Sequence, residues 1–291
     1  MMLPLTPAHL DHRRIWRDFE YCYPVISRRA RGLSLGVNLN LSQACNFNCV
    51  YCEVDRLRPS RRKNVDLDQL EAEMKALMEL AVSNEIFGIH PFSSANAEHK
   101  RLNDIAFSGD GEPTAAREFP ECVRRLARLK DSFGLPGVKM VLITNSTMLQ
   151  DPKVVAGIDE LMANNGEIWA KLDGGTEGIC QAINRSEATL DGILANLEFA
   201  GKRWPITIQT LLLEWEGKGP AGPELDAYIA KLKQLARAGV QIQRLQLLTI
   251  ARPTPEPAAR SLRPVAMDKI ASQVSGELPG LPVEVFYGPL A

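Results

Sequence analysis

From residue 33 onward, short apolar runs alternate with longer segments of helical periodicity. This alternation is typical of repeated strand–helix units that build a parallel sheet. The runs expected to form strands are Leu33–Leu41, Ile105–Ser108, Val138–Thr144, Ile168–Leu172, Ile206–Leu213 and Arg244–Leu248. Six such units fit either a partial barrel or an open doubly wound sheet, and both place their functional loops at the carboxyl ends of the strands.

The helices are expected between these strands. An apolar stripe at helical spacing follows Asp66, a residue type that caps helices, and Gln69 stands three positions later as in a capping box. The expected helices cover residues 67–81, 119–131, 152–164, 188–200, 223–237 and 267–275. The resulting domain boundaries are an N-terminal extension (1–32), a core (33–250) and a C-terminal extension or arm (251–291).

The composition is that of an ordinary globular protein: 45% of the 291 residues are apolar, and 34 Lys and Arg oppose 35 Asp and Glu. It excludes collagen-like, coiled-coil and wholly disordered chains. No run of about 18 apolar residues occurs, and polar residues interrupt the start before a signal-like core forms, so we expect a cytoplasmic protein without membrane association. Residues 1–63 carry eleven Lys and Arg against five acids, which suits an anionic partner or a solvated face.

Three of the six cysteines, Cys45, Cys49 and Cys52, form a C-x3-C-x2-C run within the eight residues CNFNCVYC. A structural zinc site normally takes a fourth protein ligand, but the nearest Cys or His residues, Cys22 and His90, lie outside any standard spacing. Thiolates also hold iron–sulfur clusters, and a four-iron cluster bound by three cysteines leaves one iron for an outside ligand. The spacing therefore favours a reactive iron–sulfur cluster.

This loop, with an aromatic residue before its last cysteine, resembles the signature of the radical S-adenosylmethionine (radical SAM) superfamily. The resemblance implies that Cys45, Cys49 and Cys52 bind a 4Fe-4S cluster and that S-adenosylmethionine chelates the fourth iron. It also implies that Tyr51 lies near the adenine. The fold class expected from the pattern and the resemblance together is α/β, a partial (β/α)6 TIM-type barrel with parallel strands.

The second expected strand leads into GDGEPT, which resembles the Gly-Gly-Glu-Pro segment of the same family. Asp110 stands where the first glycine is usual. A carboxylate from Glu112 and the backbone of a glycine-rich strand end are suited to the charged amino group of methionine. The resemblance thus assigns Gly109, Asp110, Gly111 and Glu112 to cosubstrate binding.

Polar residues at the ends of the later strands complete the resemblance. Asn145 and Ser146 suit a ribose or carboxylate, although they also suit a turn, and Lys171 with Asp173 could contact the ligand or form an ion pair. The cofactor-binding residues expected from these segments are Asn145, Ser146, Lys171, Asp173, Arg185, Thr249 and Arg252. Together the segments resemble stand-alone Fe-S oxidoreductases related to the tRNA wybutosine-synthesis enzyme, over roughly residues 33–255.

The family resemblance implies an oxidoreductase that receives one electron from a flavodoxin or ferredoxin. It then cleaves S-adenosylmethionine to methionine and a 5'-deoxyadenosyl radical, which abstracts hydrogen from a substrate. No protein residue is assigned a catalytic role. The basic segment RLRPSRRK (56–63) favours tRNA or another nucleic acid, and Arg28, Arg29 or Arg61 could instead hold an anionic small molecule. The alternatives are a glycyl-radical activase and a non-catalytic electron-transfer or sensor protein, which would need a fourth protein ligand.

Overall fold

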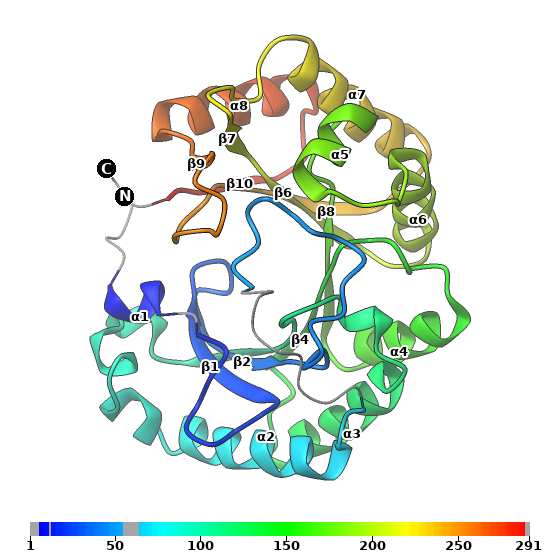
Figure 1. Cartoon of the computed structure of the whole chain (residues 1–291). Helices are drawn as coiled ribbons and strands as arrows, with labels where there is room; N and C mark the ends of the chain where they lie inside the picture. Colours follow the sequence, from blue (N-terminus) through cyan, green and yellow to red (C-terminus); the bar gives the residue numbers. More distant parts are fainter. Residues whose placement is uncertain (1–5, 12, 55–63, 289–291) are drawn as a thin grey trace. The chain divides into compact units, whose positions relative to one another are not determined.

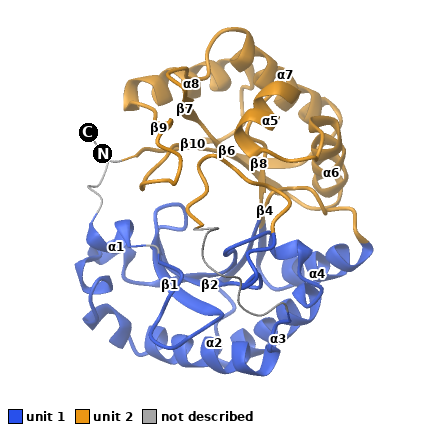
Figure 2. Cartoon of the chain, in the orientation of Figure 1, with its two compact units in different colours: residues 1–44, 59–143, 152–167 blue, residues 45–58, 144–151, 168–291 orange. Residues whose placement is uncertain are grey.

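The computed structural model describes residues 6–11, 13–54 and 64–288. The chain divides into two compact units, shown in Figure 2. The first comprises residues 1–44, 59–143 and 152–167, and the second comprises residues 45–58, 144–151 and 168–291. The cysteine loop and the GDGEPT segment therefore belong to different units.

The first unit is built on four strands that lie side by side in chain order. They are β1 (Cys22–Ser27), β2 (Gly32–Val37), β3 (Leu102–Phe107) and β4 (Lys139–Thr144). Strand β1 runs antiparallel to β2, whereas β2, β3 and β4 run parallel. The helices are α1 (Pro7–Leu10), α2 (Leu67–Val82), α3 (Phe119–Ser132), α4 (Pro152–Ala163) and the short 3-10 helices η1 (Glu85–Gly88), η2 (Phe92–Ser94), η3 (Ala97–His99) and η4 (Pro113–Ala115). Helices α2 and α3 lie along the same side of the strands (Figure 1).

The second unit repeats the strand–helix alternation. Its parallel strands, in spatial order, are β5 (Gly166–Lys171, in this unit from Ile168), β6 (Ile206–Leu211), β8 (Ile242–Leu248) and β10 (Val283–Phe286). A small antiparallel pair joins β7 (Leu213–Trp215) to β9 (Ala259–Ser261). The helices are α5 (Glu177–Asn184), α6 (Leu190–Arg203), α7 (Pro223–Arg237) and α8 (Pro264–Glu277).

The local sequence explains where these elements begin and end. Asp66 caps α2 as expected, because its carboxylate accepts hydrogen bonds from the N–H groups of Asp68 and Gln69 at 3.1 Å. The first expected strand was too long. It ends at Val37 because the Asn38 side chain accepts a hydrogen bond from the Asn40 N–H at 3.0 Å, which turns the chain out of the sheet.

All six expected strands are present, with shifted ends, and so are the six expected helices. Strands β1 and β10 were not expected; β1, within residues 1–32, pairs with β2, and β10, within residues 251–291, pairs with β8. Helix α5 was also missed; Thr176 caps it, accepting a hydrogen bond from the Ile179 N–H. Among the described helices, none has the length and apolar character needed to span a bilayer.

Candidate functional site

The cysteine loop is an irregular segment fastened to helix α5 through its backbone. The N–H of Asn48 donates to the carbonyl of Asn184 at 2.9 Å, and the N–H of Val50 donates to that of Ile183 at the same distance. Cys45, Cys49 and Cys52 form no disulfide and are partly exposed. Because the loop is tied at its centre, these two hydrogen bonds hold the segment around Cys49 against the C-terminal end of α5.

Nitrogen donors point at two of the sulfur atoms. The backbone N–H of Phe47 lies 3.4 Å from Cys45 Sγ, and the side-chain amide of Asn184 lies 3.4 Å from Cys49 Sγ. The amide of Asn145 is farther away, 4.0 Å from Cys45 Sγ. Donors of this kind stabilise negative charge on cysteine sulfur and tune bound clusters. Asn184 was not among the site residues expected from the sequence, although Arg185, the next residue, was.

Asp173 joins the cysteine loop to the rest of the second unit. Its buried carboxylate accepts hydrogen bonds from the Tyr51 hydroxyl, from the Asn184 amide at 2.9 Å and from the Leu211 N–H at 2.9 Å. The Lys171 ammonium donates to the Tyr51 oxygen at 2.7 Å and lies 4.5 Å from the centre of its ring. The Tyr51 hydroxyl therefore lies between the two charged residues that the sequence singled out.

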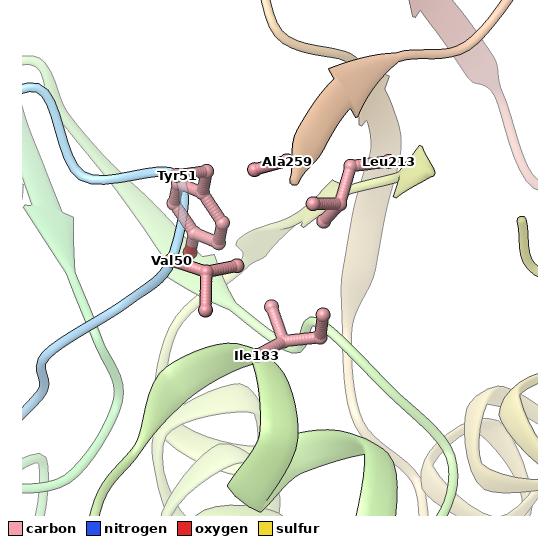
Figure 3. Packing of buried hydrophobic residues seen from close by; sticks show 5 residues of the cluster. All are labelled: Val50, Tyr51, Ile183, Leu213 and Ala259. Atoms are coloured by element: carbon pink, nitrogen blue, oxygen red, sulfur yellow. The ribbon is translucent and has the colours of Figure 1, made fainter. Parts of the chain in front are cut away.

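Burial raises the pKa of Tyr51 well above its ordinary value, and the nearby Asp173 carboxylate raises it further. The hydroxyl therefore remains a proton donor to that carboxylate. On its apolar side the ring belongs to a buried cluster with Val50, Ile183, Leu213 and Ala259 (Figure 3). This packing holds the middle of the cysteine loop against α5, β7 and β9.

Asn145 and Ser146, at the end of β4, both contact this same region. The Asn145 amide donates to the Asn46 side chain at 2.6 Å, and the Ser146 hydroxyl donates to the carbonyl of Lys171 at 2.9 Å. Ser146 adopts a positive φ of 70°, which is uncommon for a side-chain-bearing residue. Within the second unit, these two residues connect the cysteine loop to the end of β5.

Arg185 and Arg252 form ion pairs with carboxylates. Arg185 pairs with Glu256 at 2.5 Å, and Arg252 pairs with Glu53 at 2.8 Å, just after the last cysteine. Buried Nη1 of Arg252 has no hydrogen-bond partner among the described residues. The hydroxyl of Thr249 accepts a hydrogen bond from the Leu262 N–H at 2.9 Å, so the Thr249 side chain anchors the C-terminal arm.

The GDGEPT segment lies in the first unit, beside the residues that precede the cysteines. The N–H of Glu112 donates to the Ala44 carbonyl at 3.2 Å. A Cβ on Gly111 would come within 2.0 Å of that same oxygen, so only glycine permits the approach. Buried Glu112 accepts from the N–H and hydroxyl of Thr114, at 3.1 and 2.6 Å, and caps η4.

Asp110, the departure from the family pattern, is held by residues that precede it in the chain. It accepts hydrogen bonds from the Asn38 amide at 2.8 Å and from Arg14 at 3.0 Å. A Cβ on Gly109 would collide with the Asn38 side chain at 2.4 Å. The aspartate thus ties the N-terminal extension to the end of β3, a contact that the sequence pattern did not predict.

The donor set of the loop suits an iron–sulfur cluster. Burial raises the pKa of Cys49 to about 11, so its thiol must release a proton when a metal binds. No three Cys, His, Asp or Glu side chains in the described ranges lie close enough to share one metal ion. A four-iron cluster takes each thiolate on a different iron, and its ligands therefore need not converge on one point. The basic segment 56–63 falls outside the described residues.

Comparison with known families identifies the class of protein. The model of the radical SAM superfamily matches residues 39–216, and the chain belongs to that superfamily, which uses a 4Fe-4S cluster and S-adenosylmethionine. A UPF0026 protein of Helicobacter pylori is 27% identical over 240 residues, covering 79% of this chain and 66% of the relative. The GTPase Obg of Brachyspira hyodysenteriae is 23% identical over 256 residues, covering 84% of this chain and 32% of the relative.

Solved structures show the fold. Streptococcus suis SuiB bound to S-adenosylmethionine has a TM-score of 0.58 at 11% identity, covering 89% of this chain and 52% of SuiB. A structure of TYW1 with a lysine-pyruvate adduct bound has a TM-score of 0.51 at 17% identity, covering 85% of this chain and 74% of TYW1. These similarities confirm the expected class, an α/β partial barrel with mostly parallel strands.

Proposed function

We propose that the protein is a radical SAM enzyme in which Cys45, Cys49 and Cys52 hold the 4Fe-4S cluster. The observation that carries this proposal is that one loop holds three cysteines that form no disulfide, with N–H donors directed at two of the sulfurs. When bound, the cluster supplies the electron that cleaves S-adenosylmethionine to methionine and a 5'-deoxyadenosyl radical, which abstracts hydrogen from the substrate.

The residues around the loop position and bind the cosubstrate. Tyr51 is held by Asp173 and Lys171, which fixes its place in the cysteine loop, near the proposed position of the adenine. The unpartnered Nη1 of Arg252 suits a carboxylate, which guanidinium groups bind through paired N–H donors. Asp173 already accepts three hydrogen bonds, and its part is therefore to hold this arrangement in place.

The remaining residues proposed to bind the cosubstrate lie at the strand ends of each unit taken by itself. In the first unit these are Gly109, Asp110, Gly111 and Glu112; in the second they are Asn145, Ser146, Arg185 and Thr249. The Glu112 carboxylate and nearby backbone carbonyls offer acceptors for the methionine amino group. Each side chain of this set also has a protein partner, so its substitution is expected to affect folding as well as binding; the side chains are Asp110, Glu112, Asn145, Ser146, Arg185 and Thr249.

The proposed reductant is a flavodoxin or ferredoxin, and the proposed substrate is a tRNA or a small molecule. Cysteines that form no disulfide and an oxygen-sensitive cluster suit a reducing compartment such as the cytoplasm. Basic residues in the first 63 positions favour an anionic substrate, with contacts of the kind made to phosphate.

The test is anaerobic reconstitution with iron and sulfide, followed by dithionite reduction with S-adenosylmethionine and chromatography for 5'-deoxyadenosine. Wild-type protein should form the product, and S-adenosylmethionine should change the electron paramagnetic resonance spectrum of the reduced cluster. Cys49→Ala should lose bound iron, whereas Cys122→Ala, which alters a buried thiol in α3, should retain it.

Equal iron in Cys49→Ala and wild type would refute the ligand assignment. A stable cluster that gives no 5'-deoxyadenosine and no spectral response to S-adenosylmethionine would favour an electron-transfer or sensor protein. Activity that appears only with a partner protein, and leaves a glycyl radical on it, would favour an activase.

A further inference from the structure

The second unit contains a pocket that the proposed cosubstrate site does not account for. Its volume is about 410 Å³, within the range of small-molecule sites. It lies between α5, the end of β6, strand β7 and the start of α7. The lining residues on which the inference rests are Asp173, Ile179, Ala182, Leu211, Trp215 and Tyr228.

The walls of this pocket are mainly apolar. Ile179, Leu211 and Trp215 are only half-buried, so part of each side chain faces the cavity rather than a protein neighbour. Gly175 forms part of the wall where α7 approaches most closely, because a Cβ there would lie 2.0 Å from the Tyr228 nitrogen. Half-buried apolar side chains around one cavity indicate a ligand with an apolar body.

The charged residues of the lining are mostly acidic. Glu216 and Glu224 are exposed, and Asp173 is buried, against a single cation, the exposed Lys218. Arg185, whose guanidinium lies 5.6 Å from the Trp215 ring centre, is already paired with a carboxylate. The local field therefore favours a positively charged group over an anion.

The pocket adjoins the cysteine loop through residues that belong to both. Asp173 lines the pocket and accepts a hydrogen bond from Tyr51. Ile183 lines the pocket and packs in the same cluster as Val50 and Tyr51. A ligand in the pocket would therefore lie one side chain away from the cysteine loop.

We propose that this pocket binds an apolar small molecule carrying a positively charged amine, and that it holds the apolar part of the substrate. The substrate role of the pocket rests on the proposed radical SAM function. A cationic apolar ligand differs from the anionic substrate that the basic N-terminal composition suggests. Probes of opposite charge can therefore distinguish a cationic ligand of this pocket from an anionic one.

The test uses two probes with the same apolar body and opposite charge, 1-naphthylmethylamine and 1-naphthaleneacetate. Binding to the reconstituted holoenzyme is measured by anaerobic equilibrium dialysis. The amine should bind at least tenfold more tightly than the acetate. Ala182→Trp, at an exposed position on the pocket wall, should weaken binding of the amine at least tenfold. Gln181→Trp, at the exposed neighbouring position outside the lining, should leave it unchanged.

Equal binding of the two probes, or an Ala182→Trp variant that binds the amine as wild type does, would overturn the proposal. So would displacement of the amine by S-adenosylmethionine, because the pocket would then belong to the cosubstrate. Formation of 5'-deoxyadenosine is measured on the same samples. Its absence with normal amine binding would overturn the substrate role and the proposed function but retain the ligand site. Its presence without amine binding would overturn the pocket alone.

Discussion

Asp104 is a buried carboxyl group on β3 whose titration should be visible in the stability of the protein. Burial raises its pKa from 3.8 to about 6, although the Ser34 hydrogen bond and the Arg29 charge act in the opposite direction. In the unfolded chain the group loses its proton at lower pH, so folded-state stability falls as pH rises between these two values. Above pH 6 the ionised Asp104 lowers the free energy of unfolding by its full amount, about 3 kcal/mol for a pKa raised by about two.

Replacing this residue, Asp104→Asn, removes the ionisation but keeps an acceptor for Ser34. If the new amide N–H of the asparagine finds no acceptor, it lowers the free energy of unfolding by a similar amount at every pH. The informative quantity is therefore the change in the effect of the substitution between two pH values. The gain in unfolding free energy over wild type should be about 2 kcal/mol larger at pH 7.5 than at pH 4.5. Denaturant unfolding of the reduced, cluster-free protein measures it, with exposed Asp191→Asn as the control. The same gain at both pH values would refute the reasoning.

Three further substitutions probe the cysteine loop and its surroundings. Gly111→Ala should displace the Ala44 carbonyl and reduce the iron retained after reconstitution; wild-type iron content would contradict this. Asn184→Ala removes an N–H donor to the Cys49 sulfur and should weaken metal affinity by about 10–100-fold, as measured by competition with a chelator. Arg252→Ala should keep the cluster but weaken S-adenosylmethionine binding by about tenfold, or 1.4 kcal/mol; unchanged affinity by calorimetry would exclude the proposed contact.

Periodicity predicted the elements that obey one pattern over a sufficient length. The six expected strands are apolar runs that lie between amphipathic helices, and local sequence is enough to place them. Strand β1 was not predicted because it contains Pro24, which argues against a central strand. In the structure β1 lies at the edge of its sheet, where proline is tolerated. Helix α5 was missed because its eight residues, Glu177–Asn184, are too few for helical periodicity to stand out in the sequence.

The cysteine spacing and the strand-end motifs were readable because each is local in the sequence. The contacts between these segments could not be predicted from the local sequence. Tyr51 and Asp173 are separated by 122 positions, and nothing in either segment specifies that they meet. Asn184 carries no local signal apart from its place before Arg185, yet it contacts both a cysteine sulfur and the central carboxylate. The roles assigned to these residues in cofactor binding remain predictions.

The three hydrogen bonds to Asp173 have a consequence for local unfolding. They join the cysteine loop, helix α5 and the end of β6 through one carboxylate, so none of these segments can open without breaking bonds that the others use. The backbone amides of Asn48, Val50 and Leu211 should therefore exchange with solvent hydrogen at similar free energies of opening, as a single cooperative unit. The loop that carries the cysteines would then resist local unfolding as strongly as the C-terminal end of β6.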